Sequence, residues 1–288
     1  MILITGASGN VGGTVLDKVL KSGHPVTAMY RSQADARNVP ARVCVVIADF
    51  GDKDSLRRAF QCVDSLFLVC SPIPQLVEFE SNAIAVAKEV GVKHIVINSS
   101  AGADQWGKSF PKWHYEVERV LQGSEVGYSI LRPNSFMQNI PAFFAGTIQS
   151  QDAFYSSVGK SRLSLVDVQD IADVAAVLLA GEPQNKIYEL NGPEAVTYYD
   201  VAERLSKICG RTIRYIDIPM AEQKKALLGA GMPEWQAQAL VDLQQFYVEG
   251  HGAELTDDIR RITGHAPRNL NQFLAENVST FSRRVATA

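Results

Sequence analysis

The sequence predicts an α/β protein of the doubly wound type, in which helices cover both faces of a parallel sheet, with a smaller, mainly helical C-terminal subdomain. Three observations predict this class. Short β-branched runs alternate with segments of helical period as far as Pro133. The runs are apolar at successive positions, which is typical of strands buried on both faces. Three glycines at intervals of three follow the first run directly.

In chain order, the expected strands of the first half are MILIT, VTAMY, VCVVIADF, SLFLVCS, HIVINSS and YSILRP. Helices are expected over residues 10–22, 76–90 and 111–122, which lie between these strands. In the first helix, Val11, Val15 and Val19 recur on one face. Gly23 stands where a left-handed cap would end that helix.

The pattern changes after Pro133. A polar and aromatic stretch reaches Arg162, and LSLVDVQDIADVAAVLLAG then predicts a helix with Asp170 as its N-cap. The run KIYELNG predicts a strand that can rejoin the sheet. From Thr197, whose TYYD motif is typical of a capping box, helices dominate and are interrupted by IRYIDIP.

Composition excludes several classes of protein. The chain has 288 residues, 46% of them hydrophobic, and a formal net charge of -3, so no basic field is present to neutralise a nucleic-acid backbone. The N-terminus enters a strand pattern without a basic leader, and no run of about 18 uncharged apolar residues follows. We therefore expect a cytoplasmic protein that binds neither nucleic acid nor membrane.

The cysteines give no sign of a metal site or a disulfide framework. Cys44, Cys62, Cys70 and Cys209 show no C-x-x-C spacing and mostly lie in or beside apolar runs. We expect them to be small buried hydrophobic residues in a reducing compartment, and we expect no metal.

The stretch ITGASGNVGG predicts an anion site. Gly6 permits a tight turn, Gly9 lets a pyrophosphate approach the backbone, and Gly12 lets the following helix lie close to the sheet. The turn would place backbone N–H groups and the positive end of a helix dipole against a phosphate. A plain turn between strand and helix is the alternative.

The ends of the second and third strands indicate which dinucleotide binds. An NAD site carries an acid after the second strand, whereas this strand is followed by Arg31, whose guanidinium suits a 2′-phosphate. We therefore expect NADP(H) rather than NAD(H). After the third strand, Asp49 and Phe50 are expected beside the adenine. Arg31 as an ordinary surface residue, and Asp49 as the start of a turn, remain alternatives.

The motifs TGASGNVG, YR, ADF, INSSAGAD and YSILRPNSFMQN, in this order, resemble the NmrA-like branch of the atypical short-chain dehydrogenases. The resemblance runs from Met1 to about Phe281. It implies a quinone, azo-dye or triphenylmethane reductase that uses NADPH, or a sensor of NADP that catalyses nothing. We also expect cofactor contacts along the turn and at strand ends, from Ser8, Asn10, Val11, Ser71, Asn98, Pro133 and Asn134.

The catalytic residues of the wider superfamily are only partly present. A tyrosine followed four residues later by a lysine is matched by Tyr115, but Arg119 replaces the lysine. In NmrA-like relatives a lysine or histidine near the start of this helix points at the nicotinamide, and His114 is its best match. We take His114, Tyr115 and Ser99 as catalytic candidates. The alternatives are a hydrogen-bonded half-buried histidine, a packing tyrosine and a serine that begins a loop.

Aromatic residues after the sixth strand suit a slot for a planar substrate. We expect Phe136, Met137, Phe143 and Trp235 to bind it. The expected domains are residues 1–155 for NAD(P), with a return of helix and strand over 163–192, and residues 193–288 for substrate, with 133–162 contributing to the cleft. Each aromatic residue has core packing as its alternative.

The sequence thus predicts an NADPH-dependent oxidoreductase that transfers a hydride to a planar conjugated acceptor such as a quinone. Such an acceptor needs no tyrosine–lysine pair, because its product anion is delocalised and can take a proton from water. The expected partner is an aromatic or quinone-like small molecule, and the chain is expected to be a monomer or homodimer. Alternatives are an NADP(H)-sensing regulatory protein and an epimerase of nucleotide sugars, which the missing lysine disfavours.

Overall fold

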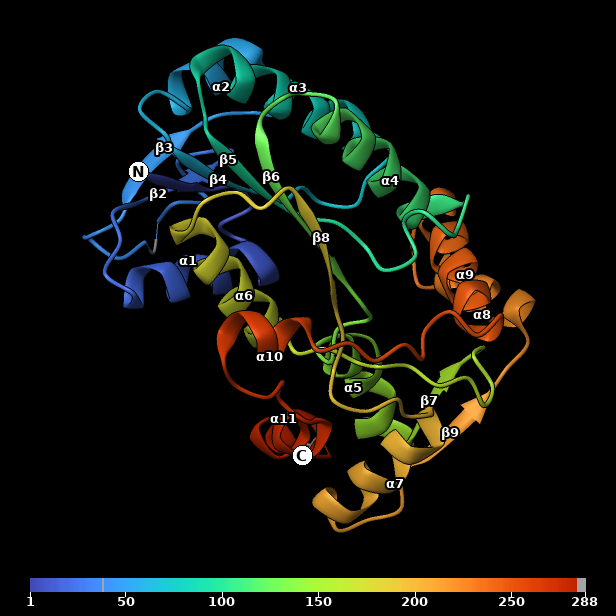
Figure 1. The fold of residues 1–288 in the computed structure, drawn as a ribbon. Coiled ribbons are helices and arrows are strands. Elements are labelled where there is room, and N and C mark those ends of the chain that lie inside the picture. The colour runs from blue at the N-terminus through green and yellow to red at the C-terminus, as the bar shows by residue number, and fades with distance from the viewer. Residues whose placement is uncertain (38, 284–288) are drawn as a thin grey trace. The chain divides into compact units, whose positions relative to one another are not determined.

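The computed structural model describes residues 1–37 and 39–283, so the last five residues of the expected substrate domain lie outside the described part. The chain forms two compact units (Figure 1). Unit 1 comprises Met1–Pro133, Val168–Leu190 and Asp257–His265. Unit 2 comprises Asn134–Asp167, Asn191–Thr256 and Ala266–Ala288. Each unit is therefore assembled from three separate segments of the chain.

Unit 1 contains the predicted parallel sheet. Within the described residues it has seven strands in the order β3-β2-β1-β4-β5-β6-β8, all of them parallel to their neighbours. The late strand β8 pairs with β6, as the KIYELNG run predicted. The bounds are β1 (Ile2–Ile4), β2 (Val26–Tyr30), β3 (Cys44–Ile47), β4 (Ser65–Leu68), β5 (His94–Asn98), β6 (Gly127–Pro133) and β8 (Lys186–Leu190).

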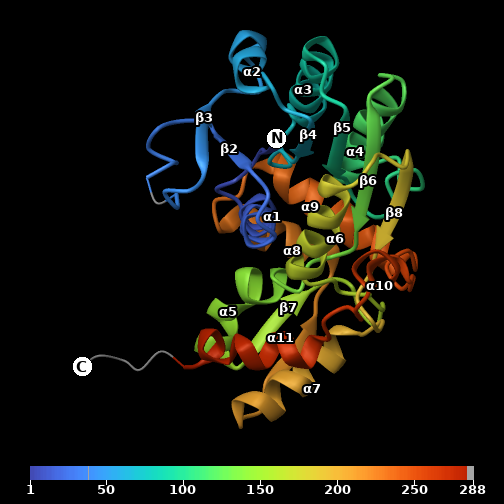
Figure 2. The same ribbon diagram turned by 60° about the vertical axis from the view of Figure 1, so that its left-hand side comes forward.

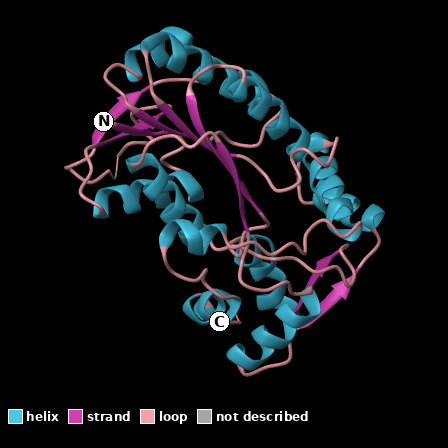
Figure 3. Cartoon of the chain, viewed as in Figure 1, coloured by secondary structure: helices cyan, strands magenta, loops and turns pink. Residues whose placement is uncertain are grey.

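Helices cover both faces of this sheet, as Figures 2 and 3 show. One face carries α2 (Lys53–Ala59), α3 (Leu76–Val90) and α4 (Ser109–Gln122). The other carries α1 (Asn10–Lys21) and α6 (Val168–Ala180), which pack against each other, and α10 (Asp258–Thr263) contacts α6 and β8. The predicted doubly wound class is confirmed.

The core of unit 1 lies between the sheet and the helices α2, α3 and α4. Leu3, Leu66 and Ile95 occupy paired positions on three adjacent strands, and all three are fully buried. Their side chains pack into one cluster with apolar residues of the helices, including Leu56 and Ile84. Because the strands are apolar on both faces, the sheet can bury both, which fixes it between two helical layers.

Unit 2 is built around a pair of short parallel strands, β7 (Ala153–Ser156) and β9 (Arg214–Asp217). An aromatic cluster fills its interior, in which the ring of Phe154 lies within 6 Å of the rings of Phe144, Tyr198 and Tyr215. Its helices are α5 (Asn139–Gln151), α7 (Tyr198–Cys209), α8 (Met220–Gly229), α9 (Glu234–Val248) and α11 (Leu270–Glu276), with a 3-10 turn at Val278–Phe281.

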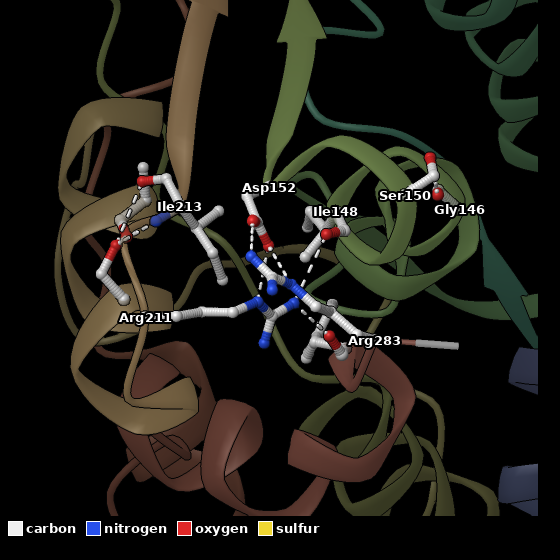
Figure 4. A network of polar contacts seen from close by, with 10 residues as sticks. Gly146, Ile148, Ser150, Asp152, Arg211, Ile213 and Arg283 are labelled. Carbon is white, nitrogen blue, oxygen red and sulfur yellow. Dashed lines mark hydrogen bonds and ion pairs between the residues drawn. The ribbon is translucent and has the colours of Figure 1, made fainter. Parts of the chain in front are cut away.

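A network of hydrogen bonds and ion pairs in unit 2 joins the C-terminal end of α5 to Arg211 and Arg283 (Figure 4). Asp152 ends α5 in a left-handed conformation with φ of 52°. Its carboxylate accepts a hydrogen bond from Nε of Arg211 at 2.6 Å and another from Arg283. Arg211 also donates to the carbonyl of Phe281 at 2.6 Å. Three segments distant in the sequence therefore meet at one carboxylate.

Two local predictions are wrong. Helix α6 begins at Val168, so Asp170 lies in its first turn and does not cap it. The cysteines are not buried, since Cys44 and Cys62 are exposed and Cys70 and Cys209 are half-buried. Cys44 is exposed because β3 is an edge strand, where an apolar run is covered less completely.

Other local predictions are confirmed. Thr197 caps α7 in a capping box with Asp200, and Gly23 follows α1 with φ of 82°. No helix within residues 1–37 and 39–283 has both the length and the apolar composition that crossing a membrane requires.

Candidate cofactor and acceptor site

The three glycines between β1 and α1 have different structural roles. A Cβ on Gly12 would lie 2.3 Å from the carbonyl oxygen of Gly6, so the close packing of this turn requires a glycine there. Gly6 has φ of +57°, and a Cβ on it would meet Val69 at 2.8 Å. A Cβ on Gly9 would touch only the Gly6 oxygen, at 3.2 Å. Gly9 therefore leaves open space at the turn, which is what a ligand needs.

The first turn of α1 offers free hydrogen-bond donors. Gly9 is its N-cap and supplies no side-chain acceptor, and the first turn contains no acidic residue. Within residues 1–37 and 39–283, the N–H groups of Asn10, Val11 and Gly12 have no acceptor. Three free N–H groups at the positive end of a helix fit an anionic phosphate.

The predicted adenosine end of the site is exposed. Arg31 follows β2 with its side chain in solvent, and no acid of the described residues pairs with it. Asp49 is also exposed, and its Oδ1 accepts the Gly51 N–H at 2.8 Å, so the carboxylate shapes a turn. The Phe50 ring stacks on Phe79 with centroids 6.4 Å apart. The guanidinium is thus available for a phosphate, whereas Asp49 and Phe50 have structural partners.

The hydroxyl of Ser99, just after β5, is engaged within the fold. It donates to Oε1 of Glu118 at 2.5 Å. Glu118 is buried and also binds Arg132, through contacts of 2.9 and 2.6 Å. Arg132 reaches two further acids, Asp104 at 3.0 Å and Glu189 at 3.1 Å. Because the Ser99 hydroxyl already donates its hydrogen bond to Glu118, it is poorly placed to donate a proton to a substrate.

Two of the predicted site residues have a buried polar atom with no partner in the described residues, Nδ1 of His114 and Oδ1 of Asn98. His114 is 8% exposed, and burial lowers the pKa of its imidazole to about 4. The ring is therefore neutral at pH 7 and can exchange hydrogen bonds without carrying a charge. Buried polar atoms without partners are rare in native proteins and suit a ligand that supplies one.

Tyr115 lies on the outer side of α4, with 38% of its surface exposed. Arg119, which replaces the usual lysine, donates to Gln122 at 3.3 Å. Within the described residues Tyr115 and Arg119 form no hydrogen bond with each other, so the pair is no proton relay.

The remaining expected cofactor contacts differ in accessibility. Ser8 and Asn10 are exposed on the turn, and Ser71 is exposed after β4. Pro133 ends β6, where its carbonyl accepts the Ala101 N–H at 3.0 Å. Asn134 is buried in unit 2, and its amide donates to Ser164, Asn191 and Gly252 at 2.8, 3.1 and 3.0 Å.

The four expected acceptor contacts all belong to unit 2 and do not share one environment. Met137 is 1% exposed and so belongs to the core of the unit, Phe143 is 53% exposed, and Phe136 and Trp235 are half-buried. Unit 2 also has a cleft of about 820 Å³, which none of the four lines. The cleft is lined by Val158, Lys160, Arg162, Ile218, Met220 and Tyr247, among others.

Sequence analysis did not single out Arg132 or Glu80, which are among the buried charged residues of unit 1. Each could have been recognised as a charge in an apolar pattern. Arg132 interrupts the run YSILRP, and Glu80 lies four residues from both Leu76 and Ile84, on the buried face of α3.

The sequence and the fold are similar to those of known reductases. The model of the NmrA-like family matches residues 1–276. An NAD(P)H azoreductase of Xenophilus azovorans is 31% identical over 284 residues, covering 98% of this chain and 99% of the relative. Quinone oxidoreductase 2 of Escherichia coli is 30% identical and covers 97% of this chain and 98% of its own.

A solved structure of a reductase also has a similar fold. The crystal structure of an NADPH-dependent quinone oxidoreductase from Escherichia coli in complex with NADPH matches this fold with a TM-score of 0.88. It is 30% identical, and the match covers 97% of this chain and 99% of that chain.

Proposed function

The chain belongs to the NmrA-like family and is an NAD(P)H-dependent oxidoreductase of that family, and we propose that it transfers a hydride from NADPH to a planar conjugated acceptor such as a quinone. NADP(H) as the cofactor agrees with the sequence prediction. What we propose beyond the cofactor is the class of molecule that accepts the hydride.

The glycine turn supports the proposal that NADPH is the hydride donor. The open space at Gly9 and the free N–H groups of Asn10, Val11 and Gly12 fit a pyrophosphate, which accepts several hydrogen bonds. The exposed guanidinium of Arg31, which pairs with no acid in the described part of the chain, fits a 2′-phosphate. Asn98 and His114, each with one orphaned polar atom, would receive the nicotinamide end.

The absence of a strong acid among the candidate catalytic residues supports a conjugated acceptor. When bound, NADPH supplies a hydride, which a conjugated acceptor can take directly. The Ser99 hydroxyl donates a hydrogen bond to Glu118, His114 is neutral at pH 7, and Tyr115 lies exposed on the outer side of α4. These residues can bind, orient and hydrogen-bond an acceptor. An aliphatic ketone would demand a proton donor with a better matched pKa.

Unit 2 would supply the acceptor contacts in this proposal. Among the expected residues, Phe136, Phe143 and Trp235 retain exposed ring surface, whereas Met137 would act only by shaping the core behind them. An aromatic acceptor gains from stacking on such rings. A cytoplasmic location and a monomer or homodimer complete the proposal.

An anaerobic screen tests the proposal. NADPH oxidation would be followed with quinones, azo dyes and simple aliphatic carbonyls, beside a direct titration of NADPH binding. We expect turnover with quinones and little with aliphatic carbonyls. Faster reduction of aliphatic carbonyls would contradict the acceptor class, while failure to bind NADPH would contradict the cofactor.

A further inference from the structure

Glu80 is a carboxyl group in the apolar core of unit 1. It lies on α3 between Leu76 and Ile84, one helical turn from each, and none of its surface is exposed. Leu76 and Ile84 belong to the core cluster beneath this helix. A glutamate is rarely fully buried unless another group pairs with it.

The contacts of Glu80 explain why it is tolerated there. Its Oε1 accepts the backbone N–H of Cys70 at 3.0 Å, and its Oε2 has no partner among the described residues. Burial raises the pKa of the Glu80 carboxyl to about 8, although the Cys70 N–H opposes this. The group is therefore mainly a neutral acid at pH 7, which avoids the cost of a buried charge.

Cys70 lies just beyond β4, beside the glycine turn. The preceding residue, Val69, is held by the hydroxyl of Thr5, which donates to its carbonyl at 3.0 Å and accepts its N–H at 2.9 Å. Val69 also lies directly against Gly6, where a Cβ would come within 2.8 Å of it. A continuous series of contacts thus joins Glu80 through Cys70 and Val69 to Thr5 and Gly6.

We propose that Glu80 is a positioning residue for NADP(H), which anchors the segment Val69–Cys70 so that the glycine turn keeps the shape that receives the pyrophosphate. The N–H of Cys70 lies beyond the paired residues of β4 and takes a side-chain oxygen as its hydrogen-bond acceptor. An apolar residue of similar size would fill the space and leave this N–H unsatisfied. The proposal rests on the cofactor half of the proposed function.

Two substitutions separate hydrogen bonding from packing. Glu80→Gln keeps the acceptor, the size and the neutral state, whereas Glu80→Leu keeps only the bulk. Glu78→Leu, at an exposed position on the same helix, is the matched control. We expect Glu80→Leu to weaken NADPH binding by roughly two- to tenfold, the effect of one neutral hydrogen bond, and Glu80→Gln and Glu78→Leu to leave it unchanged.

NADPH dissociation constants would be measured by calorimetry on the full chain, and hydrogen exchange of the segment around Cys70 would be measured without cofactor. Glu80→Leu should speed exchange there, and Glu80→Gln should restore protection. Unchanged exchange and affinity in Glu80→Leu, or equal losses in Glu80→Gln, would overturn the proposal. Weak NADPH binding by the parent protein would instead refute the proposed function, and this inference with it.

Discussion

Arg31 follows β2 with an exposed guanidinium that no acid of the described residues neutralises. Its charge would meet the 2′-phosphate that distinguishes NADPH from NADH. We expect Arg31→Ala to weaken NADPH binding by roughly ten- to hundredfold, the loss of one charge-assisted hydrogen bond, and to leave NADH binding nearly unchanged. Titrations of both cofactors check this. Arg37→Ala, another exposed arginine of the same loop, is the control, and equal weakening of both cofactors would refute the assignment.

His114 and Tyr115 are adjacent on α4 but differ in environment, since His114 is buried with an orphaned nitrogen and Tyr115 is exposed. We expect His114→Ala to slow quinone reduction more than Tyr115→Phe does, because a buried hydrogen bond strengthens as charge moves onto the acceptor. If Tyr115 were the proton donor, its loss would cost roughly a hundred- to ten-thousandfold. Single-turnover rates at saturating NADPH distinguish these outcomes. A collapse in Tyr115→Phe alone would reverse the two roles.

For single residues, the sequence could indicate which side chains suit a cofactor, but it could not indicate which of them are already hydrogen-bonded within the fold. The glycines and Arg31 were recognisable because their spacing and their place after a strand carry the information. The hydrogen bond between Ser99 and Glu118 could not be predicted, because it forms only when α4 folds against the residue that follows β5. The roles of the predicted catalytic and acceptor residues remain predictions.

At the scale of elements, we expect two glycines of the turn between β1 and α1 to have different roles, Gly12 in folding and Gly9 in cofactor binding. We expect Gly9→Val to fold and to lose affinity for both NADPH and NADH, because its side chain would occupy the space left for the pyrophosphate. Gly12→Val should instead destabilise the protein, since its Cβ would lie 2.3 Å from a backbone oxygen. Thermal unfolding and cofactor titration of both variants test this. Normal NADPH affinity in a folded Gly9→Val protein would show that the turn binds no phosphate.

The sequence predicted the elements of unit 1 well and those of unit 2 poorly. The expected helix over 76–90 is α3, and the expected helix over 10–22 is α1 to within one residue. Helix α5 was missed, because Pro141 lies inside it and its apolar residues are not confined to one face. Unit 1 follows a repeating strand–helix rhythm, whereas unit 2 is assembled from separated segments whose pairing depends on tertiary contacts.

At the scale of the whole molecule, Asp152 connects remote parts of the chain. Arg211 and Arg283 lower the pKa of the Asp152 carboxyl from 3.8 to about 2. Its contribution to stability is therefore complete above pH 3.8 and is lost as the pH falls through about 2. We expect Asp152→Asn, which keeps a residue suited to left-handed backbone, to lower the melting temperature at pH 7 and to lower it progressively less as the pH falls through 2.

Melting curves of the two proteins across this range would test that linkage, with Asp17→Asn as the control. Asp17 forms only an exposed pair with Lys21, at 3.4 Å, which contributes little to stability. A melting difference for Asp152→Asn that does not change with pH would refute the role of its charge.

Hydride transfer from NADPH to a conjugated acceptor is the central claim, and an anaerobic single-turnover reaction tests it most directly. The protein, saturated with NADPH, would be mixed with a quinone while the absorbance of the reduced nicotinamide is followed. We predict a single decay that slows when the transferred hydrogen of NADPH is replaced by deuterium. Tight NADPH binding without decay in the presence of any quinone, azo dye or carbonyl would contradict the claim and would favour a sensor of NADP(H).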